Sequence, residues 1–470
     1  MSEPSTDTVS LAPDDADERR LDEDSLLRAE FVDDVMAALD SDDPARARAL
    51  VEPLHPADLA DLFELVPAEW RRPLAAAIAD QLDGDVFAEM NDWVRDELID
   101  ALRPDQVAHL ATQLDTDDAV AIIEDMEEAD QRAVLRALAP DDRAAIEEAL
   151  SFPEESAGRL MQRELIAVPE HWCVGDVLDY LRRNEDLTTD FWEVFVVDTR
   201  HHPVGTCKLS WILRTPRDVA VADVMAREQT LLPVDMDQEE VALRFQKYAL
   251  ISAAVVDGSG RLVGMITVDD VVHIIQEEAG EDALLLSGAG EGDINEPIRD
   301  SYRARVRWLI ANLMTASLSA TIIYLLGGAI EAMWTLAVLA PIVAGLGGNA
   351  GTQTMAVTVR ALATNQLTES NTMRAIRREM SIALLNGITV AAVIAVVVTI
   401  FFGSAALGSV IGVAMLLNVV IAGLAGVVVP LTLNRFNADP AVASSIFVTM
   451  MTDSMGFLVF LGLASLFLLH

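Results

Sequence analysis

Hydrophobic positions are spread unevenly along this chain, and its last third is almost continuously apolar. A helix rises about 1.5 Å per residue, so about 20 apolar residues cross a hydrocarbon core of roughly 30 Å. Five stretches reach that length without a run of charges. The pattern therefore predicts five membrane-spanning helices, at Arg307–Leu326, Met333–Val357, Met380–Phe402, Leu407–Leu431 and Ala441–Leu469.

Residues 25 to about 150 show a different pattern, in which short apolar runs repeat with helical spacing. Three of these runs begin at a proline, Pro56, Pro104 and Pro140, with an aspartate close behind. Proline suits the first turn of a helix because its missing N–H would have no partner there, and an acid complements the helix dipole. The pattern predicts an all-α domain built as a small superhelical array; an irregular helical bundle fits it almost as well.

Between residues 160 and 278 short β-rich runs appear, and one arrangement occurs twice. Each copy has a run that ends in aspartate, then a turn, then a run that contains glycine: Asp198 and Gly205 in the first, Asp257 and Gly264 in the second. The strands are expected at Leu165–Val168, Phe195–Val197, Ala253–Val256 and Leu262–Ile266, with helices at Val174–Arg183 and Gln238–Tyr248. This α/β order resembles a tandem pair of CBS domains. Such pairs bind adenine nucleotides, or serve only as dimerisation modules.

Charge divides the chain at the same place as hydropathy. Before Val306 there are 70 acidic and 27 basic residues, and from Val306 on there are five acids and six arginines. Acidity this strong argues against nucleic acid as a partner, because phosphates would be repelled. Lysine occurs only as Lys208 and Lys247, which is typical of proteins from extreme halophiles, where the Debye length shrinks to about 3 Å. We therefore assign most carboxylates to solvation.

Residues 1–24 are polar and acidic, and we expect them to form a disordered tail without a signal peptide. Cys173 and Cys207 are too few for a disulfide framework. No Walker loop or nucleophile elbow is found, so we do not expect an enzyme.

Arginine placement predicts the orientation of the five spans. Arginines occur before the first span, between the second and third, and between the fourth and fifth. These segments all fall on one side of the membrane, and the positive-inside rule makes that side cytosolic. The N-terminus is therefore expected in the cytosol and the C-terminus outside the cell membrane.

Two features of the membrane part indicate a polar pathway. Asp453 lies near the middle of the fifth span, where a carboxylate costs several kcal/mol unless it has a partner or faces water. The second span contains Pro341–Thr354, a stretch with four glycines, Asn349 and Gln353. We expect the glycines to weaken this helix and free carbonyl oxygens, which suit a partly hydrated Mg²⁺ or Ca²⁺. Small-residue packing is the alternative, and Gly423 and Gly426 in the fourth span are assigned to it.

Taken together, these motifs resemble the MgtE family of magnesium channels and transporters. The resemblance is carried by Pro341–Gln353, by Asp439-Pro440-Ala441 with Asp453 after it, and by Glu154–Met161. It implies a homodimer with a helical N-terminal domain, tandem CBS domains, a plug helix and five membrane helices. It also implies an ion path on the dimer axis, with Mg²⁺ at Asp453 and a lining that includes Gly345, Gly348, Asn349 and Ser445.

The resemblance further implies that acids at domain interfaces sense cytosolic Mg²⁺. The matching positions are Asp237, Glu239, Asp270, Glu278, Glu281 and Asp282, and Asp115, Asp117 and Asp118 are candidates in the helical domain. Two positions depart from the family pattern. Ala249 follows Tyr248 where an acid is common, and His273 stands where an acid is usual.

We therefore predict a Mg²⁺-selective channel that is closed by cytosolic Mg²⁺. Adenine nucleotide is a further possible ligand, at the CBS domains. The alternatives are a transporter of Co²⁺, Mn²⁺ or Ca²⁺, and a membrane-anchored CBS sensor that conducts nothing. The expected division is an acidic tail at 1–24, a helical domain at 25–158, CBS domains at 159–275, a plug helix at 276–305 and the membrane domain at 306–470.

Overall fold

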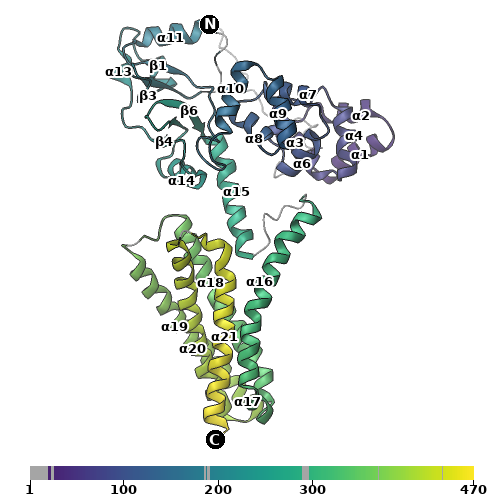
Figure 1. Cartoon of the computed structure of the whole chain (residues 1–470), viewed down its shortest axis with the longest axis vertical. Helices are drawn as coiled ribbons and strands as arrows, with labels where there is room; N and C mark the ends of the chain where they lie inside the picture. The colour runs from purple at the N-terminus through teal and green to yellow at the C-terminus, as the bar shows by residue number, and fades with distance from the viewer. Residues whose placement is uncertain are drawn as a thin grey trace, which may run out of the picture. The chain divides into compact units, whose positions relative to one another are not determined.

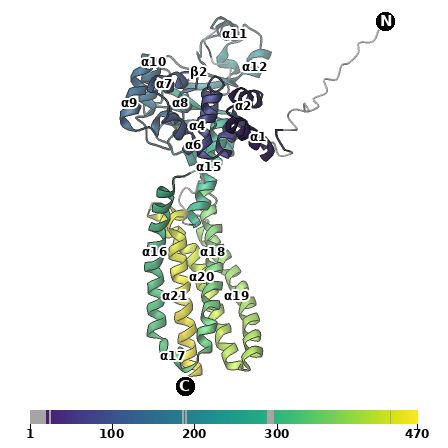
Figure 2. The ribbon, with the colours of Figure 1, turned by 90° about the vertical axis from the view of Figure 1, so that its right-hand side faces the viewer.

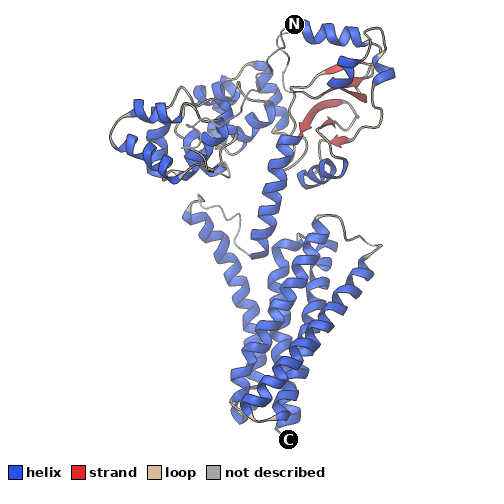
Figure 3. Cartoon of the chain, turned by 180° about the vertical axis from the view of Figure 1, so that it is seen from behind, coloured by secondary structure: helices blue, strands red, loops and turns tan. Residues whose placement is uncertain are grey.

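The computed structural model describes residues 20–22, 26–184, 187, 191–287, 296–368, 370–436 and 438–469. The chain divides into two compact units, Met1–Ile275 (the N-terminal unit) and Gln276–His470 (the membrane unit). Strands occur only in the N-terminal unit among the described residues (Figure 3). Most of the expected acidic tail, and the glycine-dotted part of the connector at 288–295, lie outside the described residues.

The first part of the N-terminal unit is all-helical, as predicted (Figure 1). Its main contacts join helices no more than three places apart in the chain, which favours a stacked array. Helices α3, α7 and α10 begin at Pro56, Pro104 and Pro140, which confirms the three proline starts. The helices are α1 Ala29–Asp40, α2 Pro44–Val51, α3 Pro56–Leu65, α4 Ala68–Ala77, α5 Gly84–Ala88, α6 Asp92–Ile99, α7 Pro104–Ala111, α8 Thr116–Glu124, α9 Glu128–Ala137 and α10 Pro140–Ala149.

The second part of this unit contains two three-stranded sheets with the same topology. In each, the first strand pairs in parallel with the second, and the second pairs antiparallel with the third. Both have a register shift at the same place, between Val196 and Val197 and between Val255 and Val256. The repeat predicted from the sequence is thus found in the structure as two sheets of equal topology, as expected for two CBS copies.

Each copy combines three short strands with two helices. The first copy has β1 Ala167–Pro169, α11 Val174–Arg183, β2 Glu193–Val197, β3 Pro203–Lys208 and α12 Leu209–Arg214. The second has α13 Val221–Val224, β4 Leu231–Pro233, α14 Gln238–Tyr248, β5 Ser252–Val256 and β6 Leu262–Thr267. Both predicted helices are confirmed at their predicted bounds, whereas β1 begins two residues later than expected.

Helix α15 follows β6 directly and runs from Val268 to Ser287. The sequence predicted a new segment at Gln276, which is where the two units divide, and α15 runs continuously through that position. No proline or strand signal interrupts it, so helical hydrogen bonding continues.

Five helices in the membrane unit are long and apolar enough to cross a membrane. Figures 1 and 2 show them as a bundle of long helices, with the short α17 (Gly327–Ala332) between the first two. Several extend beyond the predicted spans, because hydropathy marks only the hydrocarbon layer. Arg360, Arg374 and Arg378 consequently lie within helix ends and not in a loop. The five are α16 Ile298–Leu325, α18 Thr335–Ala363, α19 Thr372–Phe402, α20 Ala405–Arg435 and α21 Pro440–Leu468.

Glycines bring α20 into close contact with both α18 and α19. A Cβ added to Gly426 would lie 2.7 Å from the Gly351 carbonyl oxygen, and one added to Gly423 would lie 2.5 Å from the Ala383 Cβ. The assignment of Gly423 and Gly426 to packing is therefore confirmed. The expectation that glycines weaken the second span is wrong, because α18 is helical throughout. Its buried glycines, Gly347 and Gly351, are close-packing positions whose neighbours support the helix.

Candidate functional site

Asp453 lies near the middle of α21. It is 13 residues from Pro440, or about 20 Å along a helix of roughly 43 Å. Its side chain is partly buried, and it forms no ion pair with the residues that the structure describes. Ser445 lies two turns earlier and is also partly buried. The residue before Asp453, Thr452, is fully buried, so the helix is anchored immediately beside the carboxylate.

The residues of α18 that are predicted to line the ion pathway lie on an exposed face of the helix. Gly345 and Asn349 are exposed and Gly348 is partly exposed, whereas Gly347 and Gly351 of the same stretch are buried. A Cβ added to Gly345 or Gly348 would meet nothing within 4 Å. The α18 stretch thus has a packed side and an open side that carries an amide.

Close packing holds Asn349 and Asp453 at similar depth in the bundle. Gly351 of α18 faces α21, where an added Cβ would lie 2.7 Å from Val448 Cγ1 and 3.2 Å from Thr452 Cγ2. Asn349 lies two residues before Gly351, and Asp453 follows Thr452 directly. Both residues are near the middle of their helices, so the structure brings the amide and the carboxylate to one level of the membrane unit.

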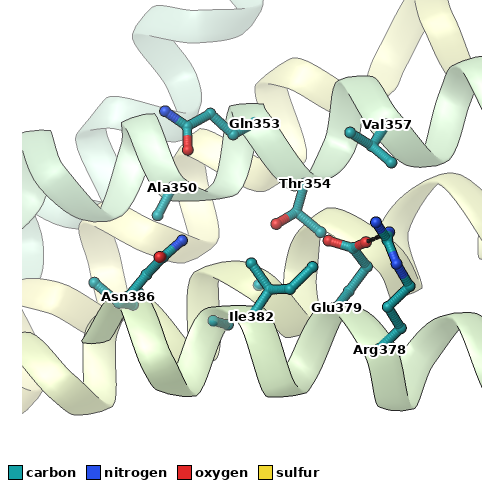
Figure 4. A pocket seen from close by; sticks show the side chains of 11 residues that line it. Ala350, Gln353, Thr354, Val357, Arg378, Glu379, Ile382 and Asn386 are labelled. Carbon is teal, nitrogen blue, oxygen red and sulfur yellow. Dashed lines mark hydrogen bonds and ion pairs between the residues drawn. The ribbon is translucent and has the colours of Figure 1, made fainter. Parts of the chain in front are cut away.

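A second polar feature of the membrane unit was not foreseen from the sequence. A groove of about 230 Å³ runs between α18, α19 and α20. Figure 4 shows Thr354 and Glu379 approaching each other from opposite walls. Glu379 is only 7% exposed and pairs with Arg378 at 2.6 Å. In the sequence, Glu379 follows an arginine close to a segment that was predicted to be a loop, so its burial was not predicted. The apolar residues near it at helical spacing were the signal that could have indicated burial.

In the N-terminal unit, α8 brings two of the candidate acids towards a predicted sensor acid. Glu164 accepts hydrogen bonds from Thr116 N (3.2 Å) and Thr116 Oγ1 (2.8 Å) at the start of α8. At its other end Glu124 pairs with Arg159 at 2.9 Å. These contacts fix α8 against the chain that enters the CBS copies. Asp117 and Asp118, in the first turn of α8, thereby come close enough for their charges to interact with that of Asp270.

We call Asp117, Asp118 and Asp270 the aspartate group. Burial, followed by repulsion from Asp270, raises the pKa of Asp117 well above its usual range and that of Asp118 to about 7. Burial also raises the pKa of Asp270, although Thr267 Oγ1 donates to its carboxylate at 2.7 Å. Asp117 Oδ1 is buried without a hydrogen-bond partner in the described part of the chain. A cation between these oxygens would relieve both costs.

The aspartate group is not an assembled metal site. Among the described residues, no three His, Cys, Asp or Glu side chains converge as metal ligands. Since Mg²⁺ keeps several waters and uses only one or two carboxylates, the group fits a hydrated ion better than a closed cage of protein ligands.

The other predicted sensor acids are placed separately. Asp237 and Glu239 are exposed at the start of α14, where Asp237 accepts a hydrogen bond from Glu239 N at 3.0 Å. On α15, Glu278 is partly buried and Glu281 is exposed. The side chain of Asp282 lies outside the described residues. At the departure from the family pattern, Ala249 ends α14 in the left-handed conformation, with φ of 49°.

The far end of α15 packs within the membrane unit. Leu285 and Leu286 are partly buried against a cluster formed by Met355 and Val359 of α18 and by Ala441 and Val448 of α21. These are the two helices that carry Asn349 and Asp453. Helix α15 therefore contains Asp270 in its first turn and contacts the candidate pathway helices at its end.

Three family matches cover successive parts of the chain. Residues 54–155 match the MgtE intracellular N domain, residues 221–277 match the CBS domain, and residues 340–463 match MgtE, described as a divalent cation transporter. The CBS match covers the second copy.

Curated relatives match over most of their length. The magnesium transporter MgtE of Thermus thermophilus is 31% identical over 438 residues, which cover 92% of this chain and 97% of that protein. The protein of the same name from Bacillus subtilis is 27% identical over 425 residues, covering 90% and 94%. A crystal structure of the cytosolic domain of the Mg²⁺ channel MgtE in complex with ATP covers 52% of this chain and 99% of its own, at 28% identity and a TM-score of 0.47.

Proposed function

This chain belongs to the MgtE family of membrane transporters, which are not enzymes, and from that premise we propose that it is a Mg²⁺-selective channel importing magnesium across the cell membrane. The observation that carries the proposal is Asp453, a carboxylate in the middle of a membrane-spanning helix, level with the amide of Asn349 on the neighbouring helix. Carboxylates at this depth mark ion pathways, because they are costly anywhere else.

The pathway acts on a hydrated ion. Magnesium sheds water reluctantly, so Asp453, Asn349 and Ser445 contact its hydration shell, with Gly345 and Gly348 leaving room for it. One carboxylate per chain attracts the ion without trapping it. In the homodimer that we propose, two copies of Asp453 face each other across the axis.

Cytosolic Mg²⁺ closes the channel through the aspartate group and α15. When Mg²⁺ is scarce, repulsion within the group favours separation of α8 from the start of α15. When Mg²⁺ is plentiful, an ion between the carboxylates favours approach. Because α15 is continuous from Asp270 to Leu286, this change reaches the helices against which Leu285 and Leu286 pack. An ion biases this equilibrium only by its differential affinity for the closed form.

The remaining predicted sensor acids and the arginines have supporting roles in this proposal. Asp237, Glu239, Glu278, Glu281 and Asp282 provide further Mg²⁺ contacts in the closed form. Arginines at one end of α16, α18, α19 and α20 orient that end to the cytosol, which places the C-terminus outside. Adenine nucleotide binding between the two CBS copies remains a prediction, and its test is isothermal titration of the full-length protein with ATP.

Ion uptake into proteoliposomes at high KCl tests the proposal. Mg²⁺, Ca²⁺, Mn²⁺ and Co²⁺ are compared for the wild type, for Asp453→Ala, and for Glu331→Gln, a matched control that removes an exposed charge from α17. We expect Mg²⁺ uptake in the wild type and the control only. Preferred uptake of another ion would make the protein a different divalent-cation transporter. No uptake of any ion would favour a non-conducting sensor.

A further inference from the structure

Asn418 lies fully buried in the membrane unit, near the middle of α20, with 0% of its surface exposed. Its Nδ2 donates a hydrogen bond of 2.9 Å to the carbonyl oxygen of Val343 on α18. Its Oδ1 is buried and has no hydrogen-bond partner in the part of the chain that the structure describes. The opposite orientation of the amide would set two oxygens against each other, so the donor assignment follows from the contact itself.

Two glycines on two other helices make room for this amide. A Cβ on Gly347 of α18 would overlap Asn418 Nδ2, and a Cβ on Gly456 of α21 would lie 2.8 Å from the same atom. Asn418 therefore fills a space bounded by the backbones of α18 and α21. Neither glycine can become alanine unless the asparagine or a helix moves.

An apolar side chain would fill this space at a lower desolvation cost. A buried amide with only part of its hydrogen bonds made is unfavourable in a membrane interior. What asparagine adds is a directional bond between helices, which sets one separation and one register. Packing alone does not explain why this site holds a polar side chain.

The two helices that meet at Asn418 are the ones that carry the candidate ion contacts. Asn349 is two residues beyond Gly347 on α18, and Asp453 is three residues before Gly456 on α21. A shift of α18 against α21 at this point would change the spacing between the amide and the carboxylate. Cation selectivity between Mg²⁺ and the larger Ca²⁺ depends on such spacing and on the rigidity of the site.

We propose that Asn418 is a positioning residue that holds α18 through its hydrogen bond to Val343 and packs against α21 at Gly456, and that it thereby sets the selectivity of the pathway for Mg²⁺ over Ca²⁺. This inference rests on the proposed function, since it assigns a specificity determinant to the same pathway. Asn418 touches no ion; it acts through the distance between the helices that do. Losing it lowers discrimination between ions more than it lowers the amount of folded protein.

The test compares Asn418→Ala, Gly347→Ala and the double variant with the wild type. Gly462→Ala is the matched control on α21, because a Cβ there meets nothing within 4 Å. Mg²⁺ and Ca²⁺ uptake into proteoliposomes gives the selectivity ratio, and thermal melting of the full-length protein gives stability. We expect N418A to lower the Mg²⁺/Ca²⁺ ratio at least fivefold and the control to leave it unchanged.

The double variant separates positioning from packing. The alanine at Gly347 refills part of the space that the asparagine vacates, but it cannot restore the hydrogen bond to Val343. We expect the melting temperature to recover towards that of the wild type while the selectivity ratio stays low. Should N418A fail to fold, the refilled double variant provides the same comparison.

Two results would overturn the inference while the proposed function stands: a Mg²⁺/Ca²⁺ ratio within twofold of the wild type in folded N418A, or a ratio that recovers together with stability in the double variant. A wild type that moves no Mg²⁺ would contradict the proposed function, and the inference would fall with it.

Discussion

The N-terminal unit and the membrane unit both contain carboxylates away from bulk water, but their surroundings differ. Burial raises the pKa of Asp117, Asp118 and Asp270, and repulsion from Asp270 raises the pKa of Asp117 and Asp118 further. Asp453 is the one acid near the middle of α21, where it lies between Thr452 and Ser454, and it forms no ion pair with the residues that the structure describes. Repelling carboxylates can hold a divalent ion and change state when it leaves. A single carboxylate attracts an ion that must pass on. This contrast is the basis on which we propose a sensor in the N-terminal unit and a pathway in the membrane unit.

The largest expected effect comes from the charge of Asp453. Asp453→Asn keeps the size of the side chain and removes its charge, so Mg²⁺ uptake should fall about tenfold or more, which corresponds to at least about 1.4 kcal/mol of lost attraction. Asp453→Glu keeps the charge and should retain part of the uptake. Equal uptake by the wild type and the asparagine variant would remove Asp453 from the pathway.

Removing two charges of the aspartate group together tests the proposed sensor. Asp117→Asn with Asp270→Asn leaves too little charge to hold an ion, so uptake should stay high at millimolar cytosolic Mg²⁺, where we expect the wild type to close. Asp269→Asn, an exposed neighbour of Asp270, is the matched control and should close normally. The measurement is uptake against internal Mg²⁺ concentration. Normal closure of the double variant would contradict the assignment of the aspartate group.

A related prediction concerns the plug end of α15. Replacing Glu281 and Asp282 together with alanine should leave the channel open at high cytosolic Mg²⁺, because the closed form loses Mg²⁺ contacts there. The same uptake assay checks it. Closure at the wild-type concentration would argue that α15 transmits the signal without binding ions itself.

Acidity should weaken the proposed sensor. The pKa of Asp118 is about 7 in the folded protein, so this group holds its proton to a higher pH than in the unfolded chain. The folded state therefore binds more protons, and without Mg²⁺ the free energy of unfolding falls as pH rises through this window. Mg²⁺ needs the ionised form, so its apparent affinity should be about tenfold higher at pH 8 than at pH 6. Mg²⁺-dependent protection of the full-length protein from protease measures this; equal affinity at both pH values would contradict the linkage.

The smallest expected effect on Mg²⁺ uptake comes from the ion pair that holds α8 in place, because its loss acts on stability. Arg159 pairs with Glu124 at 2.9 Å and also donates to the carbonyl oxygens of Leu150 and Phe152. Arg159→Met should lower the free energy of unfolding of the N-terminal unit by about 2 kcal/mol, because Glu124 loses its partner while partly buried. Arg159→Lys keeps the charge and should recover about half. Thermal melting checks both, and an unchanged melting temperature for Arg159→Met would show that Glu164 alone positions α8.

Much of this fold could be predicted from the sequence, because local residue patterns determine it. Proline starts placed α3, α7 and α10, and hydropathy placed five long helices. Helix ends were less predictable, since hydropathy records the hydrocarbon layer and not the helical turns beyond it. The glycines of α18 were misjudged because glycine weakens an isolated helix, whereas here Gly347 and Gly351 allow neighbouring helices to support it.

The candidate sites were predictable to different degrees, because some depend on local sequence and others on packing between distant segments. Asp453 stands out in sequence because a charge in an apolar run is rare. Asp117 could be named only as one of several acids, since its approach to Asp270 depends on packing between segments about 150 residues apart. Asn418 carried no signal of its own, and the apolar neighbours of Glu379 were too weak a signal, because only the folded bundle shows that both side chains are buried.

The most direct test of this account is the Mg²⁺ current of the wild-type protein in a planar bilayer as Mg²⁺ on the cytosolic side is raised. We predict a current carried by Mg²⁺ that falls as the aspartate group fills, with the inhibitory concentration shifted upward in the Asp117→Asn/Asp270→Asn variant. A Mg²⁺ current that ignores cytosolic Mg²⁺ would contradict the sensor, and the absence of any Mg²⁺ current would contradict the account as a whole.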